Sequence, residues 1–390
     1  MRIYLDHNAT TPIHPQVANT MAEVLREHFG NASSVHTFGQ TAKAYIDEAR
    51  TSLAKLLDAR PQEIVFTSGG TESNNLAIRG IAESLTSTNR RHIITSGIEH
   101  EAILNTCKFL GKQGWKISIL PIDRSGVIDP ASLETTITDD TAMVSIMHAN
   151  NEIGTIQPIN KLATIAHSVG AVFHTDAVQS VGKIPVAVDN LNIDLLSLSA
   201  HKFNGPKGVG ALWIRRGVKL VANTTGGRQE RNRRAGTENV AGIVGLGIAA
   251  QLATQNMPAK KIRVAQLRDR LEAGILQHVA GTIVNGNCDA RVPNTTNISF
   301  DRIEAESLLI ALDLEGIAIS TGSACSSGTL EPSHVLRAMG FSPHRTQNSI
   351  RFSLGENNTE SDVDRVLNVL PLVVNKLRSL SRSNERVHAS

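Results

Sequence analysis

Short apolar runs alternate with longer segments of helical spacing through the first two thirds of the chain. Seven of these runs are rich in Val and Ile and lack strict alternation, as expected for strands buried on both faces. They are EIVFTS from Glu63, HIITS from His92, KISIL from Lys116, AMVSIMHA from Ala142, AVFHTD from Ala171, DLLSLS from Asp194 and VGALWI from Val209. Helical segments lie between many of them, including one with Ile46, Ala49, Leu53 and Leu56 at helical spacing. This rhythm predicts the α/β class, with a mostly parallel sheet flanked by helices.

The rhythm changes after about residue 258. Two charged helices are expected there, followed by strands over TTNISF and NSIRFSL. A final helix has an apolar stripe formed by Val363, Val366, Leu367, Leu370, Val373, Val374 and Leu377. Thr359 and Asp362 have the spacing of a cap for this helix. We therefore predict a large domain over residues 16–258 and a small α+β domain over residues 1–15 and 259–390.

Composition narrows the class of protein. The 390 residues suffice for two packed cores, and a net charge of +3 is too small to favour nucleic acid or a membrane surface as a partner. The longest apolar stretch, VAGIVGLGIAAQLA from Val240, is too short to span a bilayer and fits a buried helix. The densest basic run, RQERNRR from Arg228, contains Glu230 and is interpreted as a solvated loop.

Cysteine usage gives the next constraint. Cys107, Cys288 and Cys325 lie far apart, which fits neither a disulfide framework nor a CxxC metal pattern. We expect no metal site, and a reducing, cytoplasmic compartment. Cys325 stands in GSACSSG, which has no bulky neighbour to bury the thiol. Because buried cysteines are the inert ones, Cys325 is a candidate for chemistry.

Polar residues follow several predicted strands, where ligands of parallel sheets bind. Gly69, Gly70 and Thr71 would place free N–H groups at a helix N-terminus, which is an anion site. Lys202 would become nucleophilic if its amine were partly desolvated. Each feature alone also fits a structural role, such as a helix cap or a lysine that reaches solvent. The other polar residues at strand ends are His100, Asn151, Asp176, Gln179, Ser199 and His201.

Together these residues match the needs of one cofactor. Pyridoxal phosphate requires a phosphate cradle, an acid that keeps its ring nitrogen protonated, and a lysine that binds its aldehyde. The anion site at Gly70 and Thr71, the carboxylate of Asp176 and the amine of Lys202 would supply these three functions.

At these positions the sequence resembles the cysteine desulfurases of the NifS/IscS type, a class V aminotransferase branch of the fold-type I pyridoxal-phosphate enzymes. The resemblance extends from YLDHNATTP to RFSLGENNTE. It rests on the motifs FTSGGTESNN, HANNEIGTIQP, HTDAVQSVGK, SAHKFNGPKG, RAGTENV and GSACSSGTLEPSHVLRAMG. It implies conversion of L-cysteine to L-alanine, with the sulfur left on the enzyme as a persulfide.

The resemblance implies how the cofactor would be held. Lys202 would bind its aldehyde, Asp176 would pair with the ring nitrogen and Gln179 with the ring hydroxyl. His100 would stack on the ring and act in catalysis, and Asn151 would also contact the cofactor. The phosphate would be bound by Gly70, Thr71, Ser199 and His201.

It also implies the substrate contacts and the partners. Asn151 and Arg351 would bind the substrate carboxylate, and Cys325, in a loop over about residues 320–332, would receive the sulfur. Thr237 would reach the phosphate of the partner subunit, so the protein would be a homodimer with composite active sites. The sulfur acceptor would be an iron–sulfur scaffold or another sulfur-accepting protein.

Two other kinds of protein remain open from the residues. A selenocysteine lyase or a small-amino-acid aminotransferase would share the cofactor site, although an aminotransferase has no need of Cys325. A binding or scaffold protein on a decayed enzyme fold is disfavoured because Lys202, Asp176 and Arg351 are all present.

Overall fold

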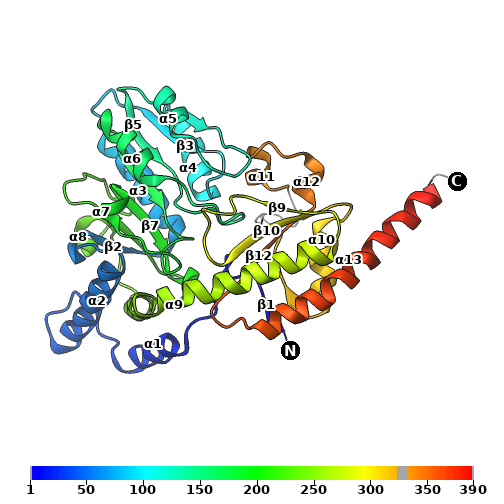
Figure 1. Ribbon diagram of the computed structural model, residues 1–390. Coiled ribbons are helices and arrows are strands. Elements are labelled where there is room, and N and C mark those ends of the chain that lie inside the picture. The colour runs from blue at the N-terminus through cyan, green and yellow to red at the C-terminus, as the bar shows by residue number, and fades with distance from the viewer. Residues whose placement is uncertain (1, 323–331, 389–390) are drawn as a thin grey trace.

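The computed structural model describes residues 2–322 and 332–388, with side chains described for 2–322 and 332–380. The chain folds around a seven-stranded sheet, a three-stranded sheet and a two-stranded pair. The long helix α9 (Val240–His278) runs from the body built on the large sheet to the one built on the small sheet (Figure 1). Cys325 lies outside the described residues.

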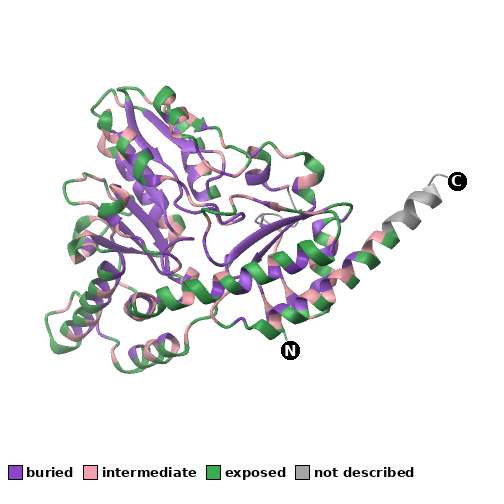
Figure 2. Ribbon diagram, in the orientation of Figure 1, coloured by how far each residue is buried: buried purple, intermediate pink, exposed green. Residues whose placement is uncertain are grey.

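The large sheet has the strand order β2-β8-β7-β6-β5-β3-β4. Strand β8 is antiparallel to β2 and β7, and the other neighbouring strands are parallel. The strands are β2 (Ile64–Thr67), β3 (His92–Ser96), β4 (Lys116–Leu120), β5 (Thr141–Ser145), β6 (Val172–Asp176), β7 (Leu195–Ser199) and β8 (Gly210–Ile214). All seven predicted strands are confirmed. Apart from the edge strand β4 they are buried almost throughout (Figure 2), which explains their continuous apolar runs.

Helices cover both faces of the large sheet. Helices α3 (Gly70–Ser84) and α4 (Glu101–Gly111) contribute to the core on one face. The core on the other face includes residues of α2 (Thr37–Leu56), α5 (Pro130–Thr136), α6 (Ile159–Ser168) and the first part of α9. The four residues that predicted α2 are buried, as expected. Shorter or peripheral elements are α1 (Pro15–Glu27), η1 (Pro61–Glu63), α7 (Val188–Leu191), η2 (Ala200–Lys202) and α8 (Gln229–Asn232).

The smaller body has a core of its own. Its antiparallel sheet has the order β12-β10-β9, and β1 pairs in parallel with β11. These strands are β1 (Ile3–Tyr4), β9 (Thr282–Asn285), β10 (Thr295–Phe300), β11 (Ile317–Ala318) and β12 (Ser349–Ser353). The helices are α10 (Ala305–Leu314), α11 (His334–Ala338), α12 (Pro343–Gln347) and α13 (Glu360–His388). Its core joins Ile3 and Leu5 to residues between 264 and 374, whereas the largest core takes residues between 17 and 257.

The prediction of two charged helices after residue 258 is wrong. Helix α9 continues through Pro258 as a single helix of 39 residues. A proline removes one backbone N–H and often ends a helix, but Pro258 is exposed and the helix is held on both sides of it. Its first part packs on α1 and α2, and α13 also packs along it. The predicted domain division at residue 258 therefore falls inside a continuous helix and stays a prediction.

Helix α9 is also long and apolar enough to cross a membrane by length and composition alone. Half of its most apolar window is buried inside the protein, including Ile243, Leu246 and Ala250. These side chains belong to the core beneath the large sheet. We therefore interpret α9 as a core helix, in agreement with the buried helix predicted from Val240.

The predicted stripe on the last helix is confirmed. Val363, Val366, Leu370 and Val374 are buried against the small sheet and its neighbours. The predicted cap is also present, because the main-chain N–H of Thr359 donates to Asp362 and the N–H of Asp362 donates to the Thr359 hydroxyl. Beyond this packed part, α13 extends away from the body of the molecule (Figure 1).

The basic run from Arg228 is only partly the solvated loop that was predicted, because Arg228 and Arg231 are exposed but Glu230 is buried. Glu230 is 7% exposed and forms a buried ion pair with Arg50 of α2 (Nη2 to Oε1, 2.7 Å). The second carboxylate oxygen accepts the N–H of Phe66 in β2 (2.9 Å). Residues 230–232 have positive φ, a conformation that L-residues adopt rarely. The ion pair was missed because its partner lies 180 positions away in the sequence.

We expect Glu230→Gln to destabilise the protein by about 3–5 kcal/mol, because it leaves the buried guanidinium of Arg50 without a counter-charge. The measurement is the free energy of unfolding in urea. Asp364→Asn is the matched control, since Asp364 pairs with Arg270 on the surface and such pairs contribute about 0–1 kcal/mol. Equal effects of the two substitutions would contradict this prediction.

Candidate active site

A cavity of about 360 Å³ opens at the carboxyl ends of the parallel strands. It is lined by residues that directly follow β2, β3, β6 and β7, by the segment after β5, and by Arg351 of β12. Ten of the residues predicted to form the site line this one cavity. They are Gly70, Thr71, His100, Asn151, Asp176, Gln179, Ser199, His201, Lys202 and Arg351.

The turn between β2 and α3 supplies one end of the cavity. Gly69 has φ +154° and ψ −175°, a region open to glycine. A Cβ on Gly70 would lie 2.8 Å from Val178 Cγ2, so the backbone approaches this neighbour more closely than a larger residue allows. The first N–H groups of the 15-residue helix α3 have no helical acceptor and carry its positive dipole end. With the Ser199 side chain nearby, this turn is suited to bind an anion.

Lys202 lies in η2, directly after β7. Its Nζ donates to the main-chain oxygens of Asn8 (2.7 Å) and Ala9 (2.9 Å). Burial and, to a smaller extent, the positive charge of Arg351 lower the pKa of the Lys202 amine to about 8, although Asp176 and Asp6 oppose this. An amine with a pKa near 8 has a neutral fraction at physiological pH and is suited to nucleophilic attack and proton transfer.

His201 precedes Lys202 in η2 and connects this turn to the N-terminal segment. Its Nδ1 lies 3.1 Å from the Thr10 hydroxyl. Burial and the nearby charges of Lys202 and Lys207 lower the pKa of His201 to about 4. His201 is therefore a neutral hydrogen-bonding group rather than a cation.

Asp176 ends β6 and is 5% exposed. Its carboxylate accepts the side-chain N–H of Asn74 at one oxygen (2.7 Å) and the main-chain N–H of Val178 at the other (2.9 Å). The buried Oδ1 of Asn74 has no hydrogen-bond partner among the described residues. Two donors fix the carboxylate in place, and it still borders the cavity, where it can pair with a cationic group.

His100 is the N-cap of α4, and its Nδ1 accepts the N–H of Ala102 (3.1 Å). When Nδ1 is an acceptor, the proton of the neutral ring lies on Nε2. The cap thus fixes the ring at the mouth of the cavity, in a position that suits contact with a flat ligand.

Glu99, next to His100, is fully buried and was not predicted to matter. One oxygen accepts the Ser96 hydroxyl (2.6 Å) and the N–H of Met147 (2.9 Å), and Oε2 has no partner among the described residues. Burial raises the pKa of the Glu99 carboxyl to about 8. Glu99 therefore carries a proton at neutral pH.

This pKa gives a stability prediction. The unfolded chain releases the Glu99 proton near its ordinary pKa of 4.5, whereas the folded chain keeps it to about pH 8, so stability falls as pH rises through this window. Glu99→Gln removes this decline, and we expect a flatter dependence of the urea unfolding free energy on pH. Glu101→Gln, at an exposed neighbouring carboxylate, is the control and should leave the slope unchanged. A Glu99→Gln slope equal to the wild-type slope would refute the prediction.

Arg351 brings a guanidinium from the small sheet to the cavity. Its Nη2 donates to Asp6 (2.6 Å) and its Nη1 to the main-chain oxygen of Asn151 (3.0 Å). The side chain is 5% exposed, and the buried Nε has no partner among the described residues. Arg351 is thus held by two protein contacts and keeps an unused N–H donor, which a ligand carboxylate can accept.

We expect Arg351→Ala to weaken L-cysteine binding by about 2–5 kcal/mol, because a partly buried carboxylate loses its charged donor. Cofactor affinity should change much less. The measurement is the dissociation constant of each ligand. Asp6→Asn is the control, since it removes the ion pair and keeps the guanidinium, and it should weaken cysteine binding far less than Arg351→Ala. Unchanged cysteine affinity in Arg351→Ala would show that Arg351 is only structural.

Two predicted site residues are not placed in the cavity. Thr237 is exposed and does not line it, so its predicted contact with a partner subunit stays a prediction. Cys325 falls outside the described residues, although Ser320 and Gly322 before it line the cavity. Of the other cysteines, Cys288 is exposed, and burial raises the pKa of the Cys107 thiol to about 12. Cys107 is therefore unsuited to act as a thiolate.

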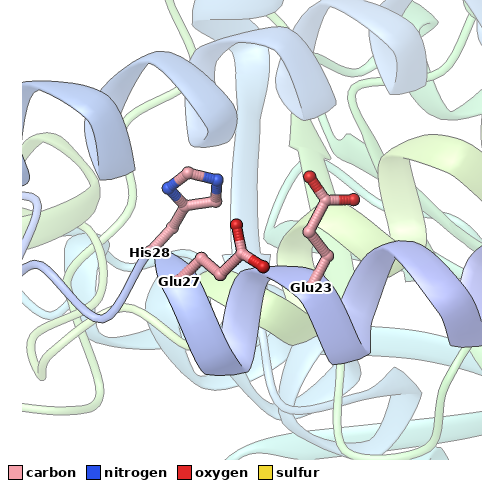
Figure 3. A group of neighbouring side chains, drawn as sticks. All are labelled: Glu23, Glu27 and His28. Atoms are coloured by element: carbon pink, nitrogen blue, oxygen red, sulfur yellow. The ribbon is translucent and has the colours of Figure 1, made fainter.

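One group of acidic and histidine side chains has the spacing of possible metal ligands. The ligand atoms of Glu23, Glu27 and His28, on and just after α1, lie within 4.8 Å of one another (Figure 3). Both glutamates are exposed, and the His28 Nε2 lies 3.1 Å from the Tyr45 hydroxyl. Exposed carboxylates commonly cluster without an ion, and this group lines none of the cavities described. We assign it no metal.

Comparison with known proteins shows the family to which this chain belongs. The aminotransferase class-V family model matches residues 3–366. The cysteine desulfurase IscS of Dictyoglomus turgidum is 52% identical over 379 residues, which cover 97% of this chain and 96% of that protein. The chain belongs to the cysteine desulfurases of the class-V aminotransferase family. The predicted family, enzyme class and fold are confirmed.

Solved structures agree with this membership in the cysteine desulfurases. A NifS-like protein superposes with a TM-score of 0.91 at 39% identity, covering 97% of this chain and 100% of that one. A second structure, SspA in complex with cysteine, has a TM-score of 0.81 at 36% identity and covers 92% and 100% of the two chains. The cysteine desulfurase fold thus extends over nearly the whole chain.

Proposed function

We propose that this enzyme uses pyridoxal phosphate to convert L-cysteine to L-alanine and takes the sulfur onto Cys325 as a persulfide. The observation that carries the proposal is the meeting of Lys202, Asp176 and the α3 N-terminus in one cavity. A lysine amine with a lowered pKa, an anchored carboxylate and an anion cradle are the three features this cofactor needs.

The residues present fit the cofactor. Gly70 lets the backbone approach Val178 where a Cβ would clash, and Thr71, Ser199 and His201 would complete a phosphate site. Lys202 would bind the aldehyde, Asp176 the protonated ring nitrogen and Gln179 the ring hydroxyl. His100 and Asn151 would contact the ring from the edge of the cavity. When bound, pyridoxal phosphate supplies an electron sink for the carbon that loses a proton.

The protein side chains would perform the remaining tasks. Arg351 and Asn151 would orient the substrate carboxylate, and the Lys202 amine would take and return the proton at the substrate Cα. The Cys325 sulfur would attack the substrate sulfur, and the substrate carbon–sulfur bond would break. One cysteine thiol of the enzyme and one L-cysteine would thus give one enzyme persulfide and one L-alanine, with all atoms balanced.

The proposed assembly is a homodimer in which Thr237 reaches the phosphate of the partner subunit. An apolar patch around Phe29, Val35 and Phe38 supports it, because these side chains are 57–91% exposed and exposed apolar patches favour protein contacts. The proposed sulfur acceptor is an iron–sulfur scaffold or another sulfur-accepting protein, in a cytoplasmic setting. Nucleic acid and membranes are not part of the proposal.

Product analysis with L-cysteine tests this function. The pyridoxal-phosphate protein should form L-alanine, and sulfide when a thiol reductant is present. Conversion of L-cysteine to a keto acid, in place of L-alanine, would indicate an aminotransferase instead. A strong preference for selenocysteine would indicate a selenocysteine lyase.

A further inference from the structure

Lys183 lies in the turn after β6 and Asp176, four residues beyond Gln179. Its Nζ donates to the Gln179 side-chain oxygen (2.6 Å) and to the Asn8 side-chain oxygen (2.8 Å). The charged groups that face it are Lys202, Arg351 and Lys260, all cationic. Among the described residues no carboxylate forms an ion pair with Lys183. Lys183 is thus an amine held by two neutral oxygens rather than by an anion.

The partners of Lys183 are buried and shared with the catalytic lysine. Gln179 is 4% and Asn8 1% exposed. The main-chain oxygen of Asn8 accepts both the Lys202 amine (2.7 Å) and the Gln179 side-chain N–H (3.0 Å). Lys183, Gln179, Asn8 and Lys202 therefore form one connected network of hydrogen bonds.

This network decides which way the Gln179 amide points. The oxygen and NH₂ of a glutamine have nearly the same shape, so neighbouring donors and acceptors set their orientation. A protonated Lys183 amine only donates, so the Gln179 oxygen faces it, and the main-chain oxygen of Asn8 only accepts, so the Gln179 NH₂ faces Asn8. The Gln179 NH₂ then points the other way, with one N–H on Asn8 and the second available to the cavity that Gln179 lines.

We propose that Lys183 is a positioning residue of the cofactor site. It makes Gln179 present an N–H donor, rather than an oxygen, to the ring hydroxyl of pyridoxal phosphate. Through Asn8 it also steadies the oxygen that receives the Lys202 amine. This inference rests on the proposed function, because it concerns the same bound cofactor.

Burial and the surrounding cations lower the pKa of Lys183 well below its ordinary value. A neutral amine has two N–H donors, and Lys183 has two oxygens to receive them. Both hydrogen bonds can therefore form in either protonation state of Lys183, and the main-chain oxygen of Asn8 keeps the Gln179 NH₂ on the opposite side.

A double-mutant cycle on the pyridoxal-phosphate protein tests the proposal. Lys183→Met and Gln179→Met are made singly and together, and the dissociation constant of pyridoxal phosphate is measured for each. We expect either single change to weaken cofactor binding about tenfold, or about 1.4 kcal/mol. The dissociation constant of the double variant should exceed that of the weaker-binding single variant by no more than about threefold, because Lys183 acts through Gln179. Independent effects that multiply to about a hundredfold would overturn the proposal.

A spectroscopic readout separates positioning from general support of the fold. Loss of the donor to the ring hydroxyl should change the pH midpoint of the visible absorbance of the bound cofactor in Lys183→Met. Lys261→Met is the matched control, because Lys261 is an exposed lysine at the rim of the small cavity that Lys183 also lines. It should leave both the midpoint and the affinity as in the wild type. An unchanged midpoint in Lys183→Met would also overturn the proposal.

If Lys183→Met does not fold, Lys183→Gln takes its place in the same cycle. Its side-chain NH₂ keeps donors in the site, so the expected weakening is smaller than for Met, and the double variant should bind pyridoxal phosphate no more than about threefold more weakly than Gln179→Met. Effects that multiply would overturn the proposal. Wild-type protein that bound no pyridoxal phosphate would contradict the proposed function and this inference together. If the wild type binds pyridoxal phosphate normally but the effects of the two substitutions multiply, only the role of Lys183 is contradicted.

Discussion

Lys202→Ala should abolish turnover of L-cysteine. The substitution removes the amine that would bind the cofactor aldehyde and also the base that would move the substrate proton. Proton transfer by a positioned side chain alone is worth about 10²–10⁴ in rate, and nucleophilic attack by the amine is lost in addition. We therefore expect alanine formation at the level of a reaction without enzyme, measured by amino-acid analysis under saturating pyridoxal phosphate.

Lys207→Ala is the matched control for this experiment. Lys207 is in the same SAHKFNGPKG segment, and it is exposed, whereas Lys202 borders the cavity. The Lys207→Ala variant should turn over L-cysteine at nearly the wild-type rate. Alanine formation at a comparable rate in Lys202→Ala, with the fold intact, would remove Lys202 from the reaction.

Cys325→Ala should still bind pyridoxal phosphate and L-cysteine but should release almost no sulfide. The thiol is the proposed acceptor of the substrate sulfur, and the cavity residues that would hold the cofactor are unchanged in this variant. Mass spectrometry after a pulse of L-cysteine should find one additional sulfur on the wild-type peptide that contains Cys325. The alanine variant should carry none.

Cys288→Ala is the stringent control, because Cys288 is exposed and its thiol can also react. Cys107 is a weaker comparison, since its thiol is buried with a pKa of about 12. The added sulfur should remain on Cys325 when Cys288 is replaced. Persulfide on Cys288 instead, or normal sulfide release by Cys325→Ala, would assign the acceptor to another residue.

The large sheet was predictable because its strands are buried on both faces. Val65, Ile94 and Val144 are examples of side chains that face one core or the other, which makes each strand a continuous apolar run. Strands β1, β9 and β11 were not predicted. They have only two to four residues, and they are defined by pairing with distant partners rather than by a local pattern.

The site was predictable to the extent that it lies at strand ends. Asp176 and Ser199 each end a strand of the sheet, and this placement alone indicated that they face one cavity. Asn8, Asn74 and Lys183 had no such signal. Asn74 meets Asp176 across 102 positions and Lys183 meets Asn8 across 175, so these contacts exist only in the fold.

The pairing of strand β1 and the residues after it affects how the protein folds during its synthesis. The N–H of Asn8 binds the Ser353 hydroxyl across 345 positions, and Ile3 pairs with Ile317. Residues 3 and 8 are therefore synthesised long before residues 317 and 353, which are their native partners. Contacts of such long sequence separation form slowly, since loop closure must precede them. The main-chain oxygen of Asn8 also accepts the Lys202 amine, so we expect this contact to form late as well, once β12 has been made.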